Sequence, residues 1–285
     1  MGDDMRFYKM SGSGNDFVFF DLSDGGPSGM ETPEAVRGIC ARGTGVGADG
    51  VVFLRARSDA AISIRYYNSD GSLGELCGNA TLCATRLAHE LGLVWAPEIR
   101  IETDAGSVAA RMVDCLPEVD LAPVSEVKAE FDLIQRLPRE KALGFARAGV
   151  PHIVIVDDDN ASADVVGRGS IIRRDRSLRD GANVNFVTPS DGGSWSMRTY
   201  ERGVEGETLA CGTGAVAAAI LLVEWGRASS PVRLETRSGR ILEVRVVQEG
   251  GIWHTSLRGH ADIVFVGELR RALGPLKAGS PWWLN

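Results

Sequence analysis

Cys77-Gly78-Asn79 recurs as Cys211-Gly212-Thr213, 134 residues further along the chain when counted from one cysteine to the other. Each copy continues into similar small and apolar residues, with Leu87 and Leu221 at the same separation. An internal repeat on this scale predicts two halves of like fold, each built as strand, polar loop, cysteine at a helix start, helix and strand. Two such halves facing each other would bring one cysteine to each side of a shared cleft.

The rest of the chain is rich in short β-branched or aromatic runs and poor in helical patterns, which favours an α+β fold. We expect two pseudo-symmetric domains, each a curved, mostly antiparallel sheet wrapped around a central helix. Pro33 after Thr32 is a helix-start signal. The expected helices are 32–41, 81–92, 131–137, 165–174 and 215–225, and the expected strands are 17–21, 51–55, 61–67, 99–103, 108–113, 153–156, 184–188, 195–200, 232–236, 241–248, 252–258 and 263–268.

The repeat also sets the expected domain boundaries. The first copy ends before 117–123, where two prolines lie, so we assign 1–118 to an N-terminal half with Cys77 and 119–260 to a C-terminal half with Cys211. A last strand follows the complete second copy. We expect the segment 261–285 to return and add this strand to the first half.

Composition excludes several classes of protein. The chain has 285 residues and a formal net charge of −7, which argues against a nucleic-acid or anionic-membrane partner. Its most apolar stretch, 215–225, is too short for a membrane span and contains Glu224. The first residues are charged and lack the apolar core of a signal peptide, so a cytoplasmic location is the expectation.

The repeated cysteines suggest proton exchange at a carbon centre. Backbone N–H groups and the helix dipole at a helix N-terminus stabilise a thiolate, which makes Cys77 and Cys211 usable bases near neutral pH. To invert a stereocentre, one group must remove a proton from one face while another group delivers a proton to the opposite face. Two related halves would supply one such group each.

The alternative is that these cysteines are small buried hydrophobic residues, as free cysteines often are. We expect this of Cys40, Cys83 and Cys115, which no polar, glycine-flanked turn surrounds. Cys77 and Cys211 differ because Gly-Asn or Gly-Thr follows each, allowing close backbone approach and an anion-binding turn. A disulfide framework is not expected from five cysteines, an odd number.

No cofactor or metal site is expected. The stretch 45–50 fits G-x-G-x-x-G, but an expected helix precedes it and an expected strand follows, which reverses the dinucleotide-binding order. The four histidines lack metal-ligand spacing, and no Cys-x-x-Cys occurs.

Polar residues at strand ends are the candidate ligand contacts. Asn15, Asn68 and Asn183 each stand at or beside such an end, although asparagine also simply makes turns there. Glu201-Arg202 places an acid beside a base, and the two side chains could bind an ammonium and a carboxylate of a ligand. Alternatively, Arg202 could form a purely structural ion pair with Glu201 or Glu207. Together these groups would suit a zwitterionic ligand.

At this point the sequence resembles the diaminopimelate epimerase family. The resemblance runs from Met5 to about Glu268, leaves 1–4 as an extension, and rests on the segments 9–17, 68–72, 77–79 and 201–214. It implies cofactor-independent interconversion of LL- and meso-diaminopimelate by a thiol and thiolate pair, in lysine and peptidoglycan precursor biosynthesis. It also implies a cytoplasmic homodimer acting on a small amino acid.

Site residues follow from the resemblance position by position. It implies that Cys77 and Cys211 are the acid/base pair and that backbone amides after each cysteine bind the reacting carboxylate. The implied substrate-binding residues are Asn15, Asn68, Gly78, Asn79, Asn183, Glu201, Arg202, Gly212 and Thr213.

Several positions depart from the family pattern. Ser11 replaces a usual His, Ala80 and Leu82 stand where Gly and Arg are common, and Val150 replaces an Asn that contacts the distal end of the substrate in many members. A racemase for another amino acid, of the proline racemase type, therefore remains an alternative, and the Glu201-Arg202 pair argues against it. A non-catalytic binding protein or phenazine-type isomerase of the same fold would lack one or both cysteines.

Overall fold

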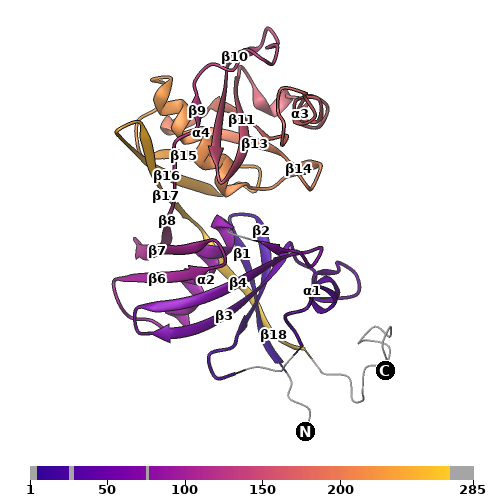
Figure 1. The fold of residues 1–285 in the computed structure, drawn as a ribbon, viewed down its shortest axis with the longest axis vertical. Coiled ribbons are helices and arrows are strands. Elements are labelled where there is room, and N and C mark those ends of the chain that lie inside the picture. Colours follow the sequence, from indigo (N-terminus) through magenta and orange to yellow (C-terminus); the bar gives the residue numbers. More distant parts are fainter. Residues whose placement is uncertain (1–4, 26–28, 75–76, 270–285) are drawn as a thin grey trace. The chain divides into compact units, whose positions relative to one another are not determined.

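The computed structural model describes residues 5–25, 29–74 and 77–269. The chain divides into two compact units: unit 1 is Met1–Pro117 with Ala261–Asn285, and unit 2 is Glu118–His260 (Figure 1). The extension expected at 1–4 and the part of the returning segment at 270–285 lie outside the described residues.

One mixed sheet forms most of unit 1. Its strands lie in the order β18-β1-β2-β3-β4-β6-β7, with short β5 pairing along β4. Only the pairs β2/β3 and β4/β6 are parallel among these ladders. The strand bounds are β1 Met5–Gly12, β2 Asn15–Asp21, β3 Gly50–Ser58, β4 Ala61–Asn68, β5 Leu73–Gly74, β6 Glu98–Thr103, β7 Gly106–Val113 and β18 Ala261–Leu269.

Helices cover the sheet of unit 1. Helix α1 (Pro33–Cys40) begins where the Thr32 side chain accepts a hydrogen bond from the N–H of Ala35. It packs on β3 and β4, and its Val36 and Ile39 join the buried side chains of Val18, Phe20, Val51 and Phe53. Helix α2 (Gly78–Glu90) packs against β1, β3, β4, β7 and β18.

Unit 2 repeats this plan with additional strands. The order is β9-β10-β11-β12-β13-β15-β16-β17-β8, with β14 pairing along β13 and with β11/β12 and β13/β15 parallel. The bounds are β8 Leu116–Val124, β9 Val127–Lys128, β10 Glu140–Ala148, β11 Val150–Asp157, β12 Asn183–Pro189, β13 Trp195–Glu201, β14 Gly206–Thr208, β15 Val232–Thr236, β16 Ile241–Glu249 and β17 Ile252–Gly259.

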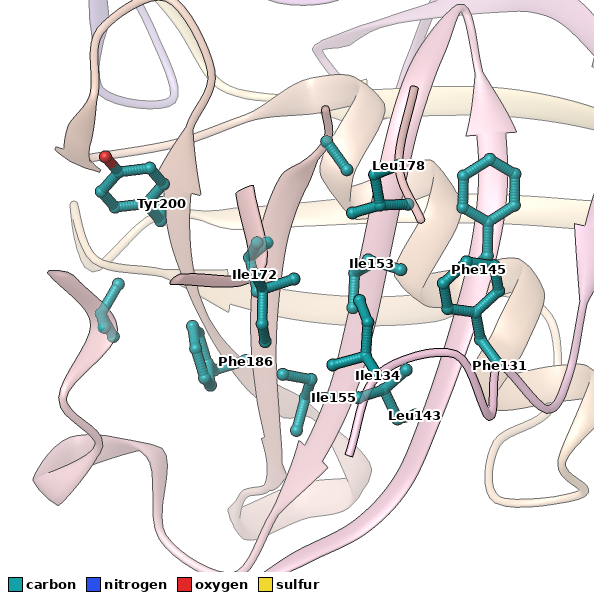
Figure 2. Packing of buried hydrophobic residues seen from close by; sticks show 13 residues of the cluster. Phe131, Ile134, Leu143, Phe145, Ile153, Ile155, Ile172, Leu178, Phe186 and Tyr200 are labelled. Atoms are coloured by element: carbon teal, nitrogen blue, oxygen red, sulfur yellow. The ribbon is translucent and has the colours of Figure 1, made fainter. Parts of the chain in front are cut away.

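Alternate residues of these strands point to opposite faces, and each face has its own helix. Helix α3 (Val165–Arg173) covers one face, and α4 (Gly212–Glu224) packs on the other, against β10, β11, β12, β16 and β17. Two short 3-10 turns lie at Asn160–Ser162 and Asp191–Gly193. Figure 2 shows the cluster on the α3 side, formed by Phe131, Ile134, Leu143, Phe145, Ile153, Ile155, Val165, Ile172, Leu178, Ala182, Val184, Phe186 and Tyr200.

The strand registers fix which residues of the two units are equivalent. In unit 1 Ile62 of β4 lies opposite Ile101 of β6, and in unit 2 Trp195 of β13 lies opposite Leu234 of β15. The number of residues from β4 to β13 is therefore the same as the number from β6 to β15. The antiparallel ladders place β12 on β3 with the same displacement, because Val52 lies opposite Tyr66 and Asn185 lies opposite Thr199. In the other parallel ladder Phe17 lies opposite Gly50 and His152 lies opposite Asn183, so β11 is displaced from β2 by two residues more. Position by position, His152 therefore corresponds to Phe17, and Asn183 corresponds to Gly50.

Some expected elements differ from those observed. The segment 131–137 forms turns rather than a helix, with Phe131 and Ile134 buried from a loop. Six strands were not expected: β1, β8 across the proposed junction, β10, and the short strands β5, β9 and β14. The last strand does pair with the first half as expected, since β18 runs antiparallel to β1 from Leu269 opposite Met5 to Ala261 opposite Gly12.

Candidate active site

Each repeated cysteine is the residue immediately before the first turn of a helix. Cys77 caps α2 and Cys211 caps α4, both with an extended backbone (φ −124° and ψ 113°, φ −140° and ψ 108°). All five cysteines are thiols. The first backbone N–H groups of a helix have no partner within it, so each cysteine residue stands at the positive end of a helix dipole. The side chain of Cys211 accepts a hydrogen bond from one of these N–H groups.

The surroundings of Cys211 are defined by direct contacts. The N–H of Gly214 donates to its Sγ at 3.4 Å, and Thr213 Oγ1 lies 3.6 Å from the sulfur. A Cβ on residue 214 would lie 2.4 Å from Asn185 Oδ1 and 3.2 Å from Sγ. Glycine at 214 is therefore required so that Asn185, the helix start and the sulfur can pack together.

In unit 1 a chain of side-chain hydrogen bonds ends at the residue two places after Cys77. Asn79 Nδ2 donates to Asn15 Oδ1 at 2.5 Å, and Asn15 Nδ2 donates to Asp49 Oδ2 at 3.3 Å. The second polar atom of the Asn79 amide, Oδ1, is buried and has no hydrogen-bond partner among the residues that the structure describes. The family-implied contacts Asn15 and Asn79 are thus held together by one network.

Charged side chains support this network from the other side. Arg42 pairs with Asp16 and with Asp49, each at 2.7 Å, and Lys9 pairs with Asp16 at 2.5 Å. Burial raises the pKa of Asp16, but hydrogen bonds from Arg42 and Lys9 outweigh it, so the net pKa is lowered. Asp49 accepts from Asn15 Nδ2 while its other oxygen pairs with Arg42, which fixes the orientation of the Asn15 amide.

Asn68 stands at the end of β4, opposite Gly50 at the start of β3. Its Nδ2 donates to Ser72 Oγ at 3.0 Å, and its Oδ1 accepts from the Tyr66 hydroxyl at 2.9 Å. The structure therefore places Asn68 at the same end of the sheet as Asn15, where it also orders the following turn.

In unit 2 the expected binding residues meet at the corresponding sheet end. Asn183 Oδ1 accepts from the backbone N–H of Arg202 at 2.7 Å, and Arg202 Nη1 donates to the carbonyl of Asp180 at 2.9 Å. Glu201 Oε2 accepts from Thr208 Oγ1 at 2.8 Å. The structural ion pair between Arg202 and Glu207, one of the alternatives considered above, is therefore not seen among the described residues.

The Glu207 carboxylate is held instead by two other arginines. Arg198 Nε lies 2.7 Å from it and Arg237 Nε lies 3.4 Å from it. Arg202 is half-buried and its guanidinium reaches Asp180.

Two buried polar residues of unit 2 were missed by sequence reasoning. His152 is fully buried on β11, and its Nδ1 lies 3.3 Å from Nδ2 of Asn185, which is also fully buried. Burial, and then the charge of Arg202, lowers the pKa of His152 to about 3. The available signal is a histidine within an apolar strand, His152 in the run 150–156, which a test for metal-ligand spacing alone does not detect.

The departure at Val150 has a clear place in the fold. Val150 begins β11 as Asn15 begins β2, so the registers make these two positions equivalent. The preceding Gly149 has φ +70°, and a Cβ there would lie 3.9 Å from Thr213 Cγ2. The half-buried Val150 thus follows a tight turn beside the start of α4. Of the other departures, Ala80 and Leu82 are fully buried in α2, and Ser11 is half-buried.

The remaining cysteines differ from Cys77 and Cys211. Burial raises the pKa of Cys40 to about 12 and that of Cys83 well above its usual range, while Cys115 is exposed. Within residues 5–25, 29–74 and 77–269 no cluster of three or more His, Cys, Asp or Glu could hold a metal ion. In the same part of the chain no helix has the length and apolar character needed to span a membrane.

Comparison with known proteins identifies the family. The family model for diaminopimelate epimerase matches residues 7–125 and 144–264. The chain belongs to the diaminopimelate epimerase family. It is 43% identical over 277 residues to the diaminopimelate epimerase of Gemmatimonas aurantiaca, which covers 93% of this chain and 99% of that one. The enzyme of Aquifex aeolicus is 37% identical, with 93% and 98% covered.

Solved structures of similar fold support the expected fold class. A PhzF-family phenazine biosynthesis protein of Bacillus anthracis has a TM-score of 0.73 at 13% identity, covering 94% of this chain and 99% of that one. A probable proline racemase of Agrobacterium radiobacter has a TM-score of 0.66 at 18% identity, covering 95% and 94%. At such low identity these likenesses concern the fold alone. The expected α+β class of the diaminopimelate epimerase family is confirmed.

Proposed function

We propose that this member of the diaminopimelate epimerase family interconverts LL- and meso-diaminopimelate in lysine and peptidoglycan precursor biosynthesis, with Cys77 and Cys211 as its acid/base pair. The observation that carries the proposal is that the two cysteines occupy the same position in the two halves, each capping the helix packed on its sheet. The relatives that share up to 43% identity are named for this reaction.

The reaction needs one proton carrier on each face of the α-carbon. One cysteine thiolate takes the proton as the Cα–H bond breaks, and the electron pair moves toward the adjacent carboxylate. The thiol of the other cysteine then donates its proton to the opposite face, so the two sulfurs exchange protonation states in each turnover. The amides of Gly78, Asn79, Gly212 and Thr213 stabilise the negative charge that develops on the carboxylate.

The distal end of the substrate is a second amino-acid group. We assign its recognition to Glu201 and Arg202, acting with Asn15, Asn68 and Asn183. A carboxylate and a guanidinium side by side suit an ammonium and a carboxylate. The hydrogen bond from Arg202 N–H to Asn183 supports this assignment, because it ties the pair to one of the expected amides.

The test is α-proton exchange in D₂O. Purified protein is incubated with LL-diaminopimelate, and deuterium incorporation and the formation of the meso isomer are followed together. Proline and lysine serve as comparison substrates. Exchange that is as fast with proline or lysine as with diaminopimelate would replace the proposal with a general amino-acid racemase.

We also propose that the enzyme is a cytoplasmic homodimer. In the described part of unit 1, β18 pairs with β1 alone, and four of its successive side chains are apolar and exposed: Ile263, Val264, Phe265 and Val266. An exposed apolar edge strand is normally covered, because it invites association. A second copy of the chain is the occupant that the family implies, and sedimentation velocity measures the oligomeric state.

A further inference from the structure

A buried polar pair distinguishes the Cys211 half from the Cys77 half. His152 and Asn185 lie on neighbouring strands β11 and β12, on the face that packs against α4, and both are fully buried. By the strand registers their equivalents in unit 1 are Phe17 and Val52, which are also buried, on the face that packs against α2. The same place in the fold is therefore filled by apolar side chains in one half.

The apolar version shows that the fold does not need a polar pair here. Burying an amide and an imidazole costs free energy unless all their polar atoms are hydrogen-bonded, and an orphaned buried group costs about 1–3 kcal/mol. One atom of the pair is orphaned, because His152 Nε2 is buried and no described protein atom bonds to it. Such an atom in a native structure calls for a reason other than packing.

The partners of Asn185 determine which ring nitrogen of His152 carries the proton. Asn185 Nδ2 lies 3.1 Å from the carbonyl oxygen of Ile153, which can only accept, so this atom is the amide nitrogen. Asn185 Oδ1 accepts from the hydroxyl of Thr199 at 2.9 Å, which agrees with that orientation. The same Nδ2 faces Nδ1 of His152, so Nδ1 must offer a lone pair.

The proton of the neutral ring is then on Nε2, the orphaned atom. Because burial and Arg202 lower the pKa of His152 to about 3, the ring stays neutral at physiological pH. The half-site of Cys211 therefore contains a neutral N–H donor that awaits an acceptor. Two further observations relate the His152 Nε2–H group to Cys211 and to Arg202.

Asn185 Oδ1 lies 2.4 Å from the position that a Cβ of residue 214 would take, and the N–H of Gly214 donates to Cys211 Sγ. Arg202 is close enough to His152 to act on its charge. A neutral donor near an arginine favours a negatively charged acceptor, and the proposed substrate carries carboxylates.

We propose that Asn185 is a positioning residue that holds His152 in its Nε2–H tautomer, so that the ring donates a hydrogen bond to a carboxylate of the bound amino acid. The role of the carboxylate rests on the proposed function. The tautomer itself does not, because it follows from protein contacts only.

The decisive measurement is the tautomer. Uniformly ¹⁵N-labelled protein is studied by two-bond ¹H–¹⁵N correlation NMR, and the His152 ring is assigned by its loss in His152→Gln. The wild type is expected to show Nε2–H alone between about pH 6 and 8, since the neutral form dominates well above its pKa. A wild-type ring protonated on Nδ1, or mixed tautomers, would overturn the proposal without any variant.

Asn185→Asp supplies a directed change. A carboxylate facing Nδ1 accepts only, so His152 should shift to the Nδ1–H tautomer, and kcat for α-proton exchange should fall about 10²-fold or more while KM changes less. Asn185→Leu removes the amide without imposing the other tautomer and should show both forms. A folded Asn185→Asp protein that retains Nε2–H, or retains wild-type kcat, contradicts the proposal.

Asn160→Leu is the matched control. Asn160 is another buried asparagine of unit 2, and its Nδ2 donates to the carbonyls of Phe186 and Ser196. The Asn160→Leu substitution should lower stability about as much as Asn185→Leu does. It should leave the His152 tautomer unchanged and kcat within about threefold of wild type, because the Asn160 side chain donates to Phe186 and Ser196 rather than to His152. If wild type fails to exchange diaminopimelate, the function proposal fails, and the kinetic arm moves to whichever amino acid does exchange.

Discussion

The side-chain amide of Asn79 donates to Oδ1 of Asn15 at 2.5 Å, which joins the first turn of α2 to the start of β2. Asn15 in turn donates to Asp49, whose carboxylate pairs with Arg42. Each bond sets the direction of the next, because a carboxylate can only accept. The result is an Asn79 Oδ1 that is oriented, buried and left as an acceptor next to Cys77.

Asp49→Asn should weaken substrate binding more than it slows the chemistry. An amide at position 49 can face Asn15 with either its oxygen or its nitrogen, so Asn15 loses its single orientation. Loss of one oriented hydrogen bond corresponds to about 1–1.5 kcal/mol, so KM should rise roughly 10-fold with kcat little changed. Steady-state kinetics with LL-diaminopimelate measures both constants.

The control for this substitution is Glu34→Gln. It also removes an acid from an arginine pair of unit 1, here the exposed pair with Arg37 on α1, which has no link to Asn15. Both variants should lose less than about 1 kcal/mol of stability, as exposed pairs usually do. Equal KM values in the two variants would show that the Asp49 network does not orient Asn15.

Replacing either repeated cysteine should abolish racemisation. Each face of the α-carbon has one proton carrier, so Cys77→Ala and Cys211→Ala should each lose at least ~10⁴-fold, the upper end for an acid/base residue. Cys115→Ala, an exposed cysteine outside the repeat, should keep full activity. Circular dichroism checks the fold, and turnover near the wild-type rate in either of the first two variants would refute the two-base mechanism.

The position of the cysteines could be predicted from sequence because the repeat marks one point in the fold twice. The strand β10 could not, because Lys141, Ala142 and Ala146 are not typical strand formers. Its pairing with both β9 and β11 overrides the local preference. At 131–137 a helix is expected but absent. Phe131 and Ile134 have helical spacing, yet they belong to a loop before Pro138 and are buried in the cluster of unit 2.

The orienting side chains were beyond sequence reasoning for a different reason. His152 and Asn185 are 33 residues apart, and nothing local indicates that they touch. Only the parallel register of β11 and β12 places them together and shows that Phe17 and Val52 occupy the equivalent places. Asp49 lies within the segment 45–50, which fits only a nucleotide-binding pattern in the sequence, and Arg42 lies just before that segment.

Arg202→Lys should change substrate preference rather than remove activity. Lysine keeps the charge but loses the planar fork that binds a carboxylate through two hydrogen bonds. We therefore expect exchange of diaminopimelate to fall about 10-fold or more, with exchange of a monoamino acid such as lysine much less affected. The control is Arg233→Lys, an exposed arginine on β15. An unchanged ratio of the two rates means that Arg202 does not recognise the distal carboxylate.

His152 should make the protein less stable as the pH falls below about 6.5. The unfolded chain takes up a proton near that pH, whereas the folded state does not do so until about pH 3, because burial and Arg202 lower the pKa of His152. The unfolded state therefore binds more protons in this window, and the free energy of unfolding decreases as the pH falls. The loss between roughly pH 7.5 and 5 is about 2 kcal/mol.

Urea unfolding of wild type and His152→Gln at both pH values measures this contribution by difference. The variant should lack that part of the pH dependence, while His254→Gln, at an exposed histidine, should retain it. A wild-type curve with the same pH dependence as His152→Gln means that His152 is already charged in the folded protein.

Gly214→Ala should damage the Cys211 half-site through a single methyl group. The new Cβ would lie 2.4 Å from Asn185 Oδ1 and 3.2 Å from Cys211 Sγ, and neither atom has room to retreat in a buried helix start. Overpacking of this kind costs about 1–3 kcal/mol of stability. In α2 the equivalent position is Ala80, so alanine is compatible with the helix itself.

Gly206→Ala is the control, because a Cβ there would meet no atom within 4 Å. The Gly214→Ala variant should lose melting temperature and, by displacing the N–H that donates to Sγ, at least 10-fold in kcat, consistent with loss of one oriented donor. Wild-type kcat in this variant would show that the contact between Gly214 and Cys211 has no part in catalysis, even if stability falls.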